Sequence, residues 1–133
     1  MHIFMKKVLD INNIKGIRIS VKSKFKGSFQ KKNKILHSFR SSITIHNLGK
    51  SYIQILSNSK SILEPFLKEN TLLKFSSKPL IKPGKKIKIY LDHFLKSKAA
   101  KVNGYFSMIS LDNSKKFKAY IPSIRLTHPE ILN

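Results

Sequence analysis

Apolar and polar residues alternate strictly over residues 14–22. Ile17, Ile19 and Val21 fall on one side of an extended backbone, and Arg18 and Lys22 lie on the other. Successive side chains of a strand point to opposite faces, so the pattern predicts a half-buried strand with a basic outer face.

Five later segments show the same alternation and predict five more strands. They are residues 41–46, 51–56, 86–91, 105–111 and 116–121. The short stretch 47–50 predicts a hairpin between the first two of them, and Asp112-Asn113-Ser114 predicts a hairpin loop between the last two. Pro83-Gly84 is typical of a type II turn.

Other segments predict helices and irregular chain. Apolar residues at 62, 63, 66 and 67 have a helical period and predict a helix over residues 59–70. A short helix is expected within 92–101, a Lys-rich connector with a flexible Gly27 over 22–34, and an irregular tail from Pro122 onward. The predicted fold class is therefore α+β, with short antiparallel strands and one or two helices.

The chain is expected to divide near residue 75. Residues 1–75 are predicted to form a strand-rich basic domain, and residues 76–133 a β-rich extension that ends in the irregular tail. A length of 133 residues supports a real but modest hydrophobic core.

Charge points to the partner. The chain has 27 Lys and Arg against six Asp and Glu, a net charge of +21. Each phosphate that such a chain neutralises releases counterions, so a nucleic acid is the expected polyanion. Only three of the cations are Arg, and Lys acts as a point charge toward phosphate, which favours contact with the backbone over reading of base edges.

The expected RNA contacts lie in three Lys-rich segments and at one nearby Arg. Phe25 and Phe29 within the first segment could stack on unpaired bases, but we favour them as anchors that hold the segment to the core. The expected contact residues are Lys22, Lys24, Lys26, Lys31, Lys32, Lys34, Arg40, Lys82, Lys85, Lys86, Lys115 and Lys116.

Catalytic chemistry is not indicated. The six acids share no motif, the five His have no metal-ligand spacing, and Cys is absent. No Gly-rich phosphate loop or nucleophile motif occurs. We expect no enzyme activity, no catalytic or metal-binding residue, no cofactor, no small-molecule substrate and no membrane partner.

Residues 16–27 resemble the start of the C-terminal domain of the third small-subunit ribosomal protein. The shared pattern is a strand of the form G-I-[KR]-I-x-[VI] followed by a basic segment that ends in glycine; Ser23 stands where the family has a glycine. The resemblance covers at most residues 14–57. It implies that strands 41–46 and 50–56 end that domain and that residues 28–34 replace its short helix. Residues 41–50 also resemble segments of small-subunit protein nineteen.

Charge, composition and this resemblance together predict a structural constituent of a mitochondrial ribosome, with the small subunit favoured. Its partners would be rRNA and neighbouring ribosomal proteins. The first seven residues lack the Arg- and Ser-rich amphipathic character of an import sequence, so we expect none. The Ile, Asn, Phe and Lys bias of the whole chain is typical of AT-rich coding, and synthesis inside the organelle is therefore a hypothesis. A free-standing organellar nucleic-acid-binding or packaging protein is the alternative.

Overall fold

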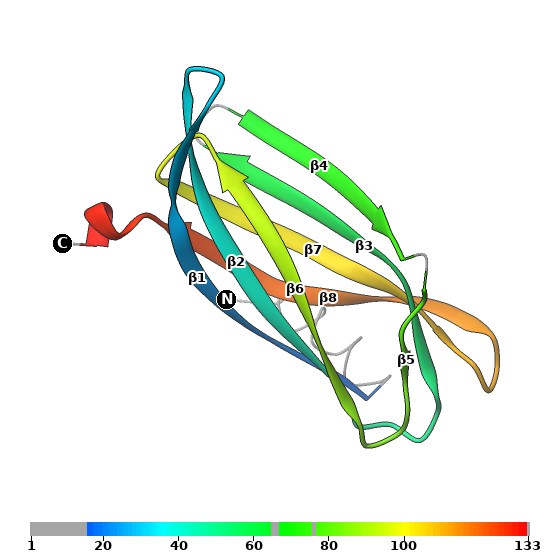
Figure 1. Ribbon diagram of the computed structural model, residues 1–133. Coiled ribbons are helices and arrows are strands. Elements are labelled where there is room, and N and C mark those ends of the chain that lie inside the picture. Colours follow the sequence, from blue (N-terminus) through cyan, green and yellow to red (C-terminus); the bar gives the residue numbers. More distant parts are fainter. Residues whose placement is uncertain (1–15, 65–66, 76, 133) are drawn as a thin grey trace, which may run out of the picture.

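The structure, a computed structural model, describes residues 16–64, 67–75 and 77–132. Within these residues, eight strands form two antiparallel sheets that pack face to face (Figure 1). A short 3-10 helix, η1, follows at Pro129–Leu132. The strands are β1 (Ile17–Lys31), β2 (Lys34–Asn47), β3 (Ile53–Glu64), β4 (Leu67–Lys74), β5 (Leu80–Ile81), β6 (Lys86–Leu95), β7 (Ala99–Ser110) and β8 (Lys115–Thr127).

The smaller sheet has the order β1-β2-β6, and the larger has the order β4-β3-β7-β8, with β5 beside the start of β3. No α-helix occurs among the residues that the structure describes. The α+β prediction is therefore wrong, and the fold is an all-β sandwich. Strands from both sides of residue 75 share both sheets, because β6 pairs with β2 and β7 pairs with β3.

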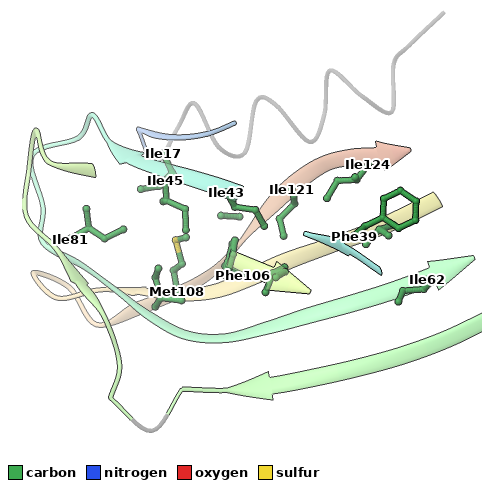
Figure 2. Close-up of a cluster of buried hydrophobic side chains, with 14 of the residues drawn as sticks. Ile17, Phe39, Ile43, Ile45, Ile62, Ile81, Phe106, Met108, Ile121 and Ile124 are labelled. Carbon is green, nitrogen blue, oxygen red and sulfur yellow. The ribbon is translucent and has the colours of Figure 1, made fainter. Parts of the chain in front are cut away.

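The core lies between the two sheets and consists of the side chains that point inward from the strands of both sheets. Ile43 and Ile45 of β2 face Phe106 and Met108 of β7, and all four are fully buried (Figure 2). Fully burying a side chain of this size stabilises the fold by about 1.5–3 kcal/mol relative to leaving it exposed. The alternation seen in the sequence is thus the division between core and surface.

β2 and β3 do not form the predicted hairpin, because they belong to different sheets. The chain crosses between the sheets at Asn47, whose side chain is fully buried. Its Nδ2 donates to the carbonyl oxygens of Ser51 at 2.8 Å and Ile81 at 3.0 Å, and its Oδ1 accepts from Gly49 N. The amide side chain of Asn47 therefore forms hydrogen bonds with three backbone groups at the crossing.

The helix predicted over 59–70 is wrong. Its described residues lie in β3 and β4, which pair from Ser57 and Lys74 to Glu64 and Leu67; residues 65–66 lie outside the described part. The short helix expected within 92–101 is wrong too. β6 continues to Leu95, β7 begins at Ala99, and the turn between them is held by Glu64. Its Oε1 accepts from the backbone N of Lys96 at 2.9 Å and of Ser97 at 2.8 Å.

The Lys-rich segment 22–34 is no flexible connector. β1 runs through it and turns back into β2 at Lys32 and Asn33, forming a long hairpin. The tail expected from Pro122 also begins later, because β8 continues to Thr127. Pro122 is tolerated there because β8 is an edge strand and its register with β7 shifts at this point.

Other expectations are confirmed. The described part of each of the six predicted segments coincides with a strand except at its ends, where residues 16, 51, 52 and 111 lie just outside, and residues 111–114 join β7 to β8. Gly84 has a φ of 80°, and Lys85 N donates to Lys82 O at 3.0 Å, as a type II turn requires. The N-terminal residues on which the expectation of no import sequence depends, 1–15, lie outside the described part.

Candidate nucleic-acid interface

The outer surface of the smaller sheet carries most of the basic side chains that the strand pattern predicted to face outward. We call this surface the basic face and define it by the outward residues of β1 as far as Phe29, of β2 from Leu36 onward and of β6. Its cations are Arg18, Lys22, Lys24, Arg40, Lys86 and Lys88, and all six are exposed.

Strand register arranges these side chains in rows across the sheet. Arg18 of β1 lies opposite His46 of β2, which lies opposite Lys86 of β6. Two residues further along, Ser20, Thr44 and Lys88 form the next row. Long basic side chains therefore stand on the outer strands.

The central strand contributes smaller side chains to the rows that follow. Ser42 separates Lys22 from Tyr90, and Ser38 lies opposite Phe94. Both Ser residues are half-buried. In the first of these rows a small polar side chain of β2 therefore lies between larger side chains on β1 and β6, and in the second Gly27 is the β1 residue.

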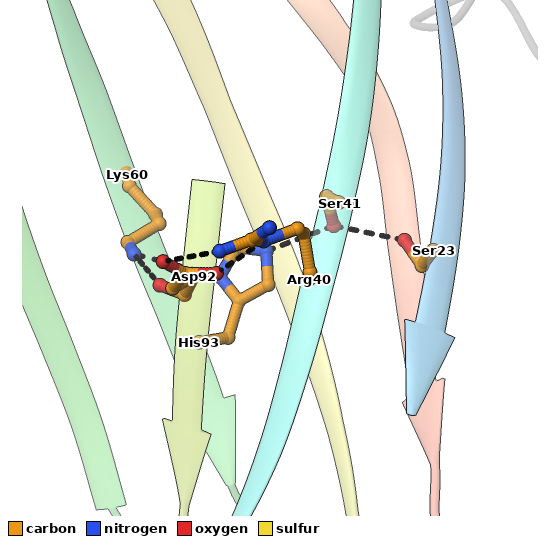
Figure 3. A network of polar contacts seen from close by, with 6 residues as sticks. All are labelled: Ser23, Arg40, Ser41, Lys60, Asp92 and His93. Carbon is orange, nitrogen blue, oxygen red and sulfur yellow. Dashed lines mark hydrogen bonds and ion pairs between the residues drawn. The ribbon is translucent and has the colours of Figure 1, made fainter. Parts of the chain in front are cut away.

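One acid interrupts this face, and it is already paired. Arg40 Nε donates to Asp92 Oδ1 at 2.8 Å, and Nη2 lies 3.5 Å from Oδ2 (Figure 3). This hydrogen bond lowers the pKa of Asp92 and raises that of Arg40. Asp92 is the one carboxylate on the described part of this face, so five cations remain without a carboxylate neighbour there.

Aromatic rings lie beside the charges. Tyr90 is 57% exposed and Phe94 is 49% exposed, both on β6. The guanidinium of Arg40 lies 5.7 Å from the centre of the Tyr90 ring. Phe29 of β1 meets Phe94 edge to face, with ring centres 6.0 Å apart. Three partly exposed aromatic rings therefore share the basic face with its cations.

The structure brings part of the predicted contact set together. Lys22, Lys24, Arg40 and Lys86 lie on the basic face, and Lys26 is exposed at a bulge in β1. The remaining predicted residues lie elsewhere. Lys31, Lys32 and Lys34 stand at the tip of the β1–β2 hairpin, Lys82 and Lys85 in the turn before β6, and Lys115 and Lys116 at the start of β8 in the other sheet.

Two of these groups extend the face at its ends. The hairpin tip continues β1 and β2 beyond Phe29, and Lys85 O accepts from Asn47 N beside the row that contains His46. At about 3.3 Å per residue, β1 alone spans roughly 45 Å. The turn before β6 and the hairpin tip lie at opposite ends of the smaller sheet (Figure 1). Cations therefore follow one long track between these two ends.

The sequence-based contact set missed Arg18, Lys88, Tyr90 and Phe94. A signal for them was present, since each occupies an outward position of an alternating segment or of its continuation. The two Phe residues of the first segment have different environments. Phe25 packs against Phe39 of the core with ring centres 5.3 Å apart, as expected for an anchor, whereas Phe29 is 42% exposed.

A polar network crosses the interior beneath this face (Figure 3). Ser41 Oγ lies 2.8 Å from His93 Nε2 and 2.8 Å from Ser23 Oγ, and the other ring nitrogen of His93 lies 3.4 Å from Lys60 Nζ. Burial lowers the pKa of His93 to about 4, with the Lys60 charge as the next cause. In a Ser-His-Asp triad, a carboxylate accepts a hydrogen bond from the second ring nitrogen of the histidine. Here the ammonium group of Lys60 lies at that nitrogen of His93, so Ser41 and His93 do not form such a triad.

No group of three or more His, Asp or Glu side chains within the described ranges is arranged to hold a metal ion. The same part of the chain contains no helix with the length and apolar character of a bilayer-spanning segment.

Comparison with known proteins defines the fold class. No family model and no curated protein matches the chain. A Northeast Structural Genomics Consortium target labelled SoR45 is similar in structure, with a TM-score of 0.81 at 21% identity over 89% of this chain and 91% of that one. A Bordetella pertussis protein, provisionally named ApaA, has a TM-score of 0.70 at 18% identity over 85% and 94%. At these identities the similarity shows the antiparallel β-sandwich and no activity.

Proposed function

We propose that the protein binds RNA through the basic face. The observation that supports this most strongly is the set of cations on one side of one sheet. Five of the six have no carboxylate neighbour on that surface. Like charges held together on a rigid sheet repel one another, and a bound polyanion removes that cost.

The positive charges supply the affinity for RNA, and the sheet sets the spacing of those charges. An RNA strand that lies along the face, parallel to the β-strands, meets a new row of side chains about every 7 Å, because successive rows are two residues apart. The rows present Lys side chains, which act as point charges toward phosphates. Binding of this kind depends strongly on salt and weakly on sequence.

The proposed setting is a mitochondrial ribosome, with the small subunit favoured, where rRNA and neighbouring proteins would cover the chain. The free-standing nucleic-acid-binding protein is the second candidate, and the same basic face would serve either one. Co-sedimentation with ribosomal subunits in moderate salt supports the first candidate. Release from them in the same salt supports the second.

The test of RNA binding compares two double variants that each remove two positive charges. Lys22→Gln/Lys88→Gln alters the basic face, and Lys101→Gln/Lys118→Gln alters exposed lysines of the other sheet. We expect the first variant to weaken binding to a short oligouridylate and to flatten the plot of log K against log salt by about 1.4, near 0.7 for each lost phosphate contact.

The control variant is expected to bind much like the unaltered protein. Equal losses in the two variants would contradict the proposal, since net charge alone would then explain binding. Absence of binding by the unaltered protein at low salt would contradict it as well.

A further inference from the structure

We propose that the RNA held on this face is single-stranded, with its bases stacked on Tyr90 and Phe94 and its phosphates directed to the lysines of β1. This inference rests on the proposed function and adds the class of RNA and its orientation across the sheet. It follows from the different side chains that β1 and β6 bring to the same rows.

One row pairs a cation with a ring, and a second ring follows further along β6. Lys22 of β1 and Tyr90 of β6 lie in one row, with Ser42 between them, and Phe94 lies on β6 four residues further along. Two strand spacings, about 10 Å, separate β1 from β6. Phosphate and base leave the sugar of a nucleotide in different directions, so one nucleotide can reach both outer strands across the small side chains of β2.

The two rings are placed for two different bases. Tyr90 and Phe94 are about 14 Å apart along the strand, too far to contact the same base. Another side chain packs against each ring on one side. Arg40 lies against Tyr90, and Phe29 lies against Phe94. These neighbours restrict the rings in the free protein, which lowers the entropy lost when a base stacks.

Asp92 lies between the rings and keeps phosphates away from β6 at that point. Its carboxylate lowers the positive potential on β6 at this point, although Arg40 pairs with it through a 2.8 Å hydrogen bond. Lys24 of β1 and Arg40 of β2 stand in the same row. The charges in this row therefore direct the RNA backbone toward β1 and leave the part of β6 from Tyr90 to Phe94 to the bases.

Only unpaired bases offer their faces to such a surface, because the bases of a duplex are already stacked and paired. Stacking on an aromatic side chain tolerates any base, which agrees with a surface that reads little sequence. The charge track then supplies affinity, and the rings supply the preference for single strands.

The first experiment measures binding of an oligouridylate, alone and annealed to its complement, to the full chain and to Tyr90→Ala/Phe94→Ala. Both side chains are exposed, so the variant is expected to fold. We expect it to bind the single strand at least about fivefold more weakly, with an unchanged salt slope and unchanged duplex binding. Tyr52→Ala, a variant of a 46% exposed Tyr outside the face, is the control and is expected to bind normally.

The second experiment uses the absence of Trp from the chain. In Tyr90→Trp the single indole is expected to be quenched when oligouridylate binds, and in Tyr52→Trp it is expected to stay unchanged. Equal affinity for single strand and duplex, with no quenching at position 90, would overturn the stacking inference and leave RNA binding by the face intact. Binding of neither RNA would overturn both.

Discussion

Lys60 Nζ lies 3.4 Å from His93 Nδ1, inside the sandwich and beneath the basic face. An ammonium group can only donate, so Nδ1 must accept, and the ring proton of neutral His93 is on Nε2. Nε2 then donates to Ser41 Oγ, which leaves the Ser41 hydroxyl to donate to Ser23. The contact with one charged group thus fixes the direction of every hydrogen bond in the network.

Stability should fall with acid through His93. Its pKa is about 4 in the folded protein and near 6.5 when unfolded, so between these values the unfolded chain binds more protons. The stability that neutral His93 provides is present above pH 6.5 and is lost as pH falls toward 4, to a total of about 3 kcal/mol. Urea unfolding across this range should show a shallower pH dependence in His93→Gln than in the unaltered protein. Parallel curves would contradict this assignment.

Removing the charge of Lys60 should raise the pKa of His93. The Lys60 charge lowers that pKa, although burial is the larger cause. In Lys60→Met we therefore expect a partial return toward the ordinary value, measured by NMR titration of the ring protons. An unchanged or lower pKa would show that the ammonium group does not face the ring.

Ser41→Ala should destabilise the fold, because it leaves the buried Nε2–H of His93 without its acceptor. An unsatisfied buried donor costs about 1–3 kcal/mol. Its neighbour Ser42 faces outward on the basic face, so Ser42→Ala provides a matched control with an expected change within about 0.5 kcal/mol. Denaturant unfolding of the two variants gives the comparison, and similar midpoints would argue against a structural role for the network.

Two Ile residues of β2 test the division between core and surface. Ile43 is fully buried, whereas Ile35 is 61% exposed near the hairpin tip. Truncation of Ile43 to Ala should cost about 2–5 kcal/mol, because a cavity is left in the core. Ile35→Ala should change the free energy of unfolding by about 0.5 kcal/mol or less. Comparable losses at both positions would mean that the hairpin tip is packed in solution.

The sequence predicted the strands with regular alternation and failed where a bulge breaks it. In β3 the register shifts between Ile55 and Ser57. After the shift, the buried positions include the polar Asn58 as well as Ile62. Beyond the bulge, the apolar residues of β3 no longer recur at every second position. Those near residue 62 have the spacing of a helix by coincidence.

The long hairpin was missed for a related reason. Its turn places Lys32 and Asn33 at φ values of 50° and 64°, where Asn-Gly would be the usual signal. Gly27, which suggested flexibility, has a φ of 129° at the bulge in β1. A bulge of this kind needs a residue without a side chain and does not end the strand.

The candidate site was predicted in part. Outward cations such as Lys22 and Lys24 follow from local alternation, which the sequence displays directly. The placement of β6 beside β2 depends on pairing between segments about 50 residues apart, such as Arg40 and Asp92. No local pattern encodes that pairing, so the meeting of Tyr90, Phe94 and the β1 lysines could not be anticipated.

Lysine footprinting by mass spectrometry tests the central claim most directly. The full chain is modified with an amine-reactive reagent, alone and with one equivalent of oligouridylate. We expect RNA to protect Lys22, Lys24, Lys86 and Lys88 and to leave Lys101 and Lys118 as reactive as before. Equal protection on both sheets, or protection confined to the lysines of the larger sheet, would contradict RNA binding by the basic face.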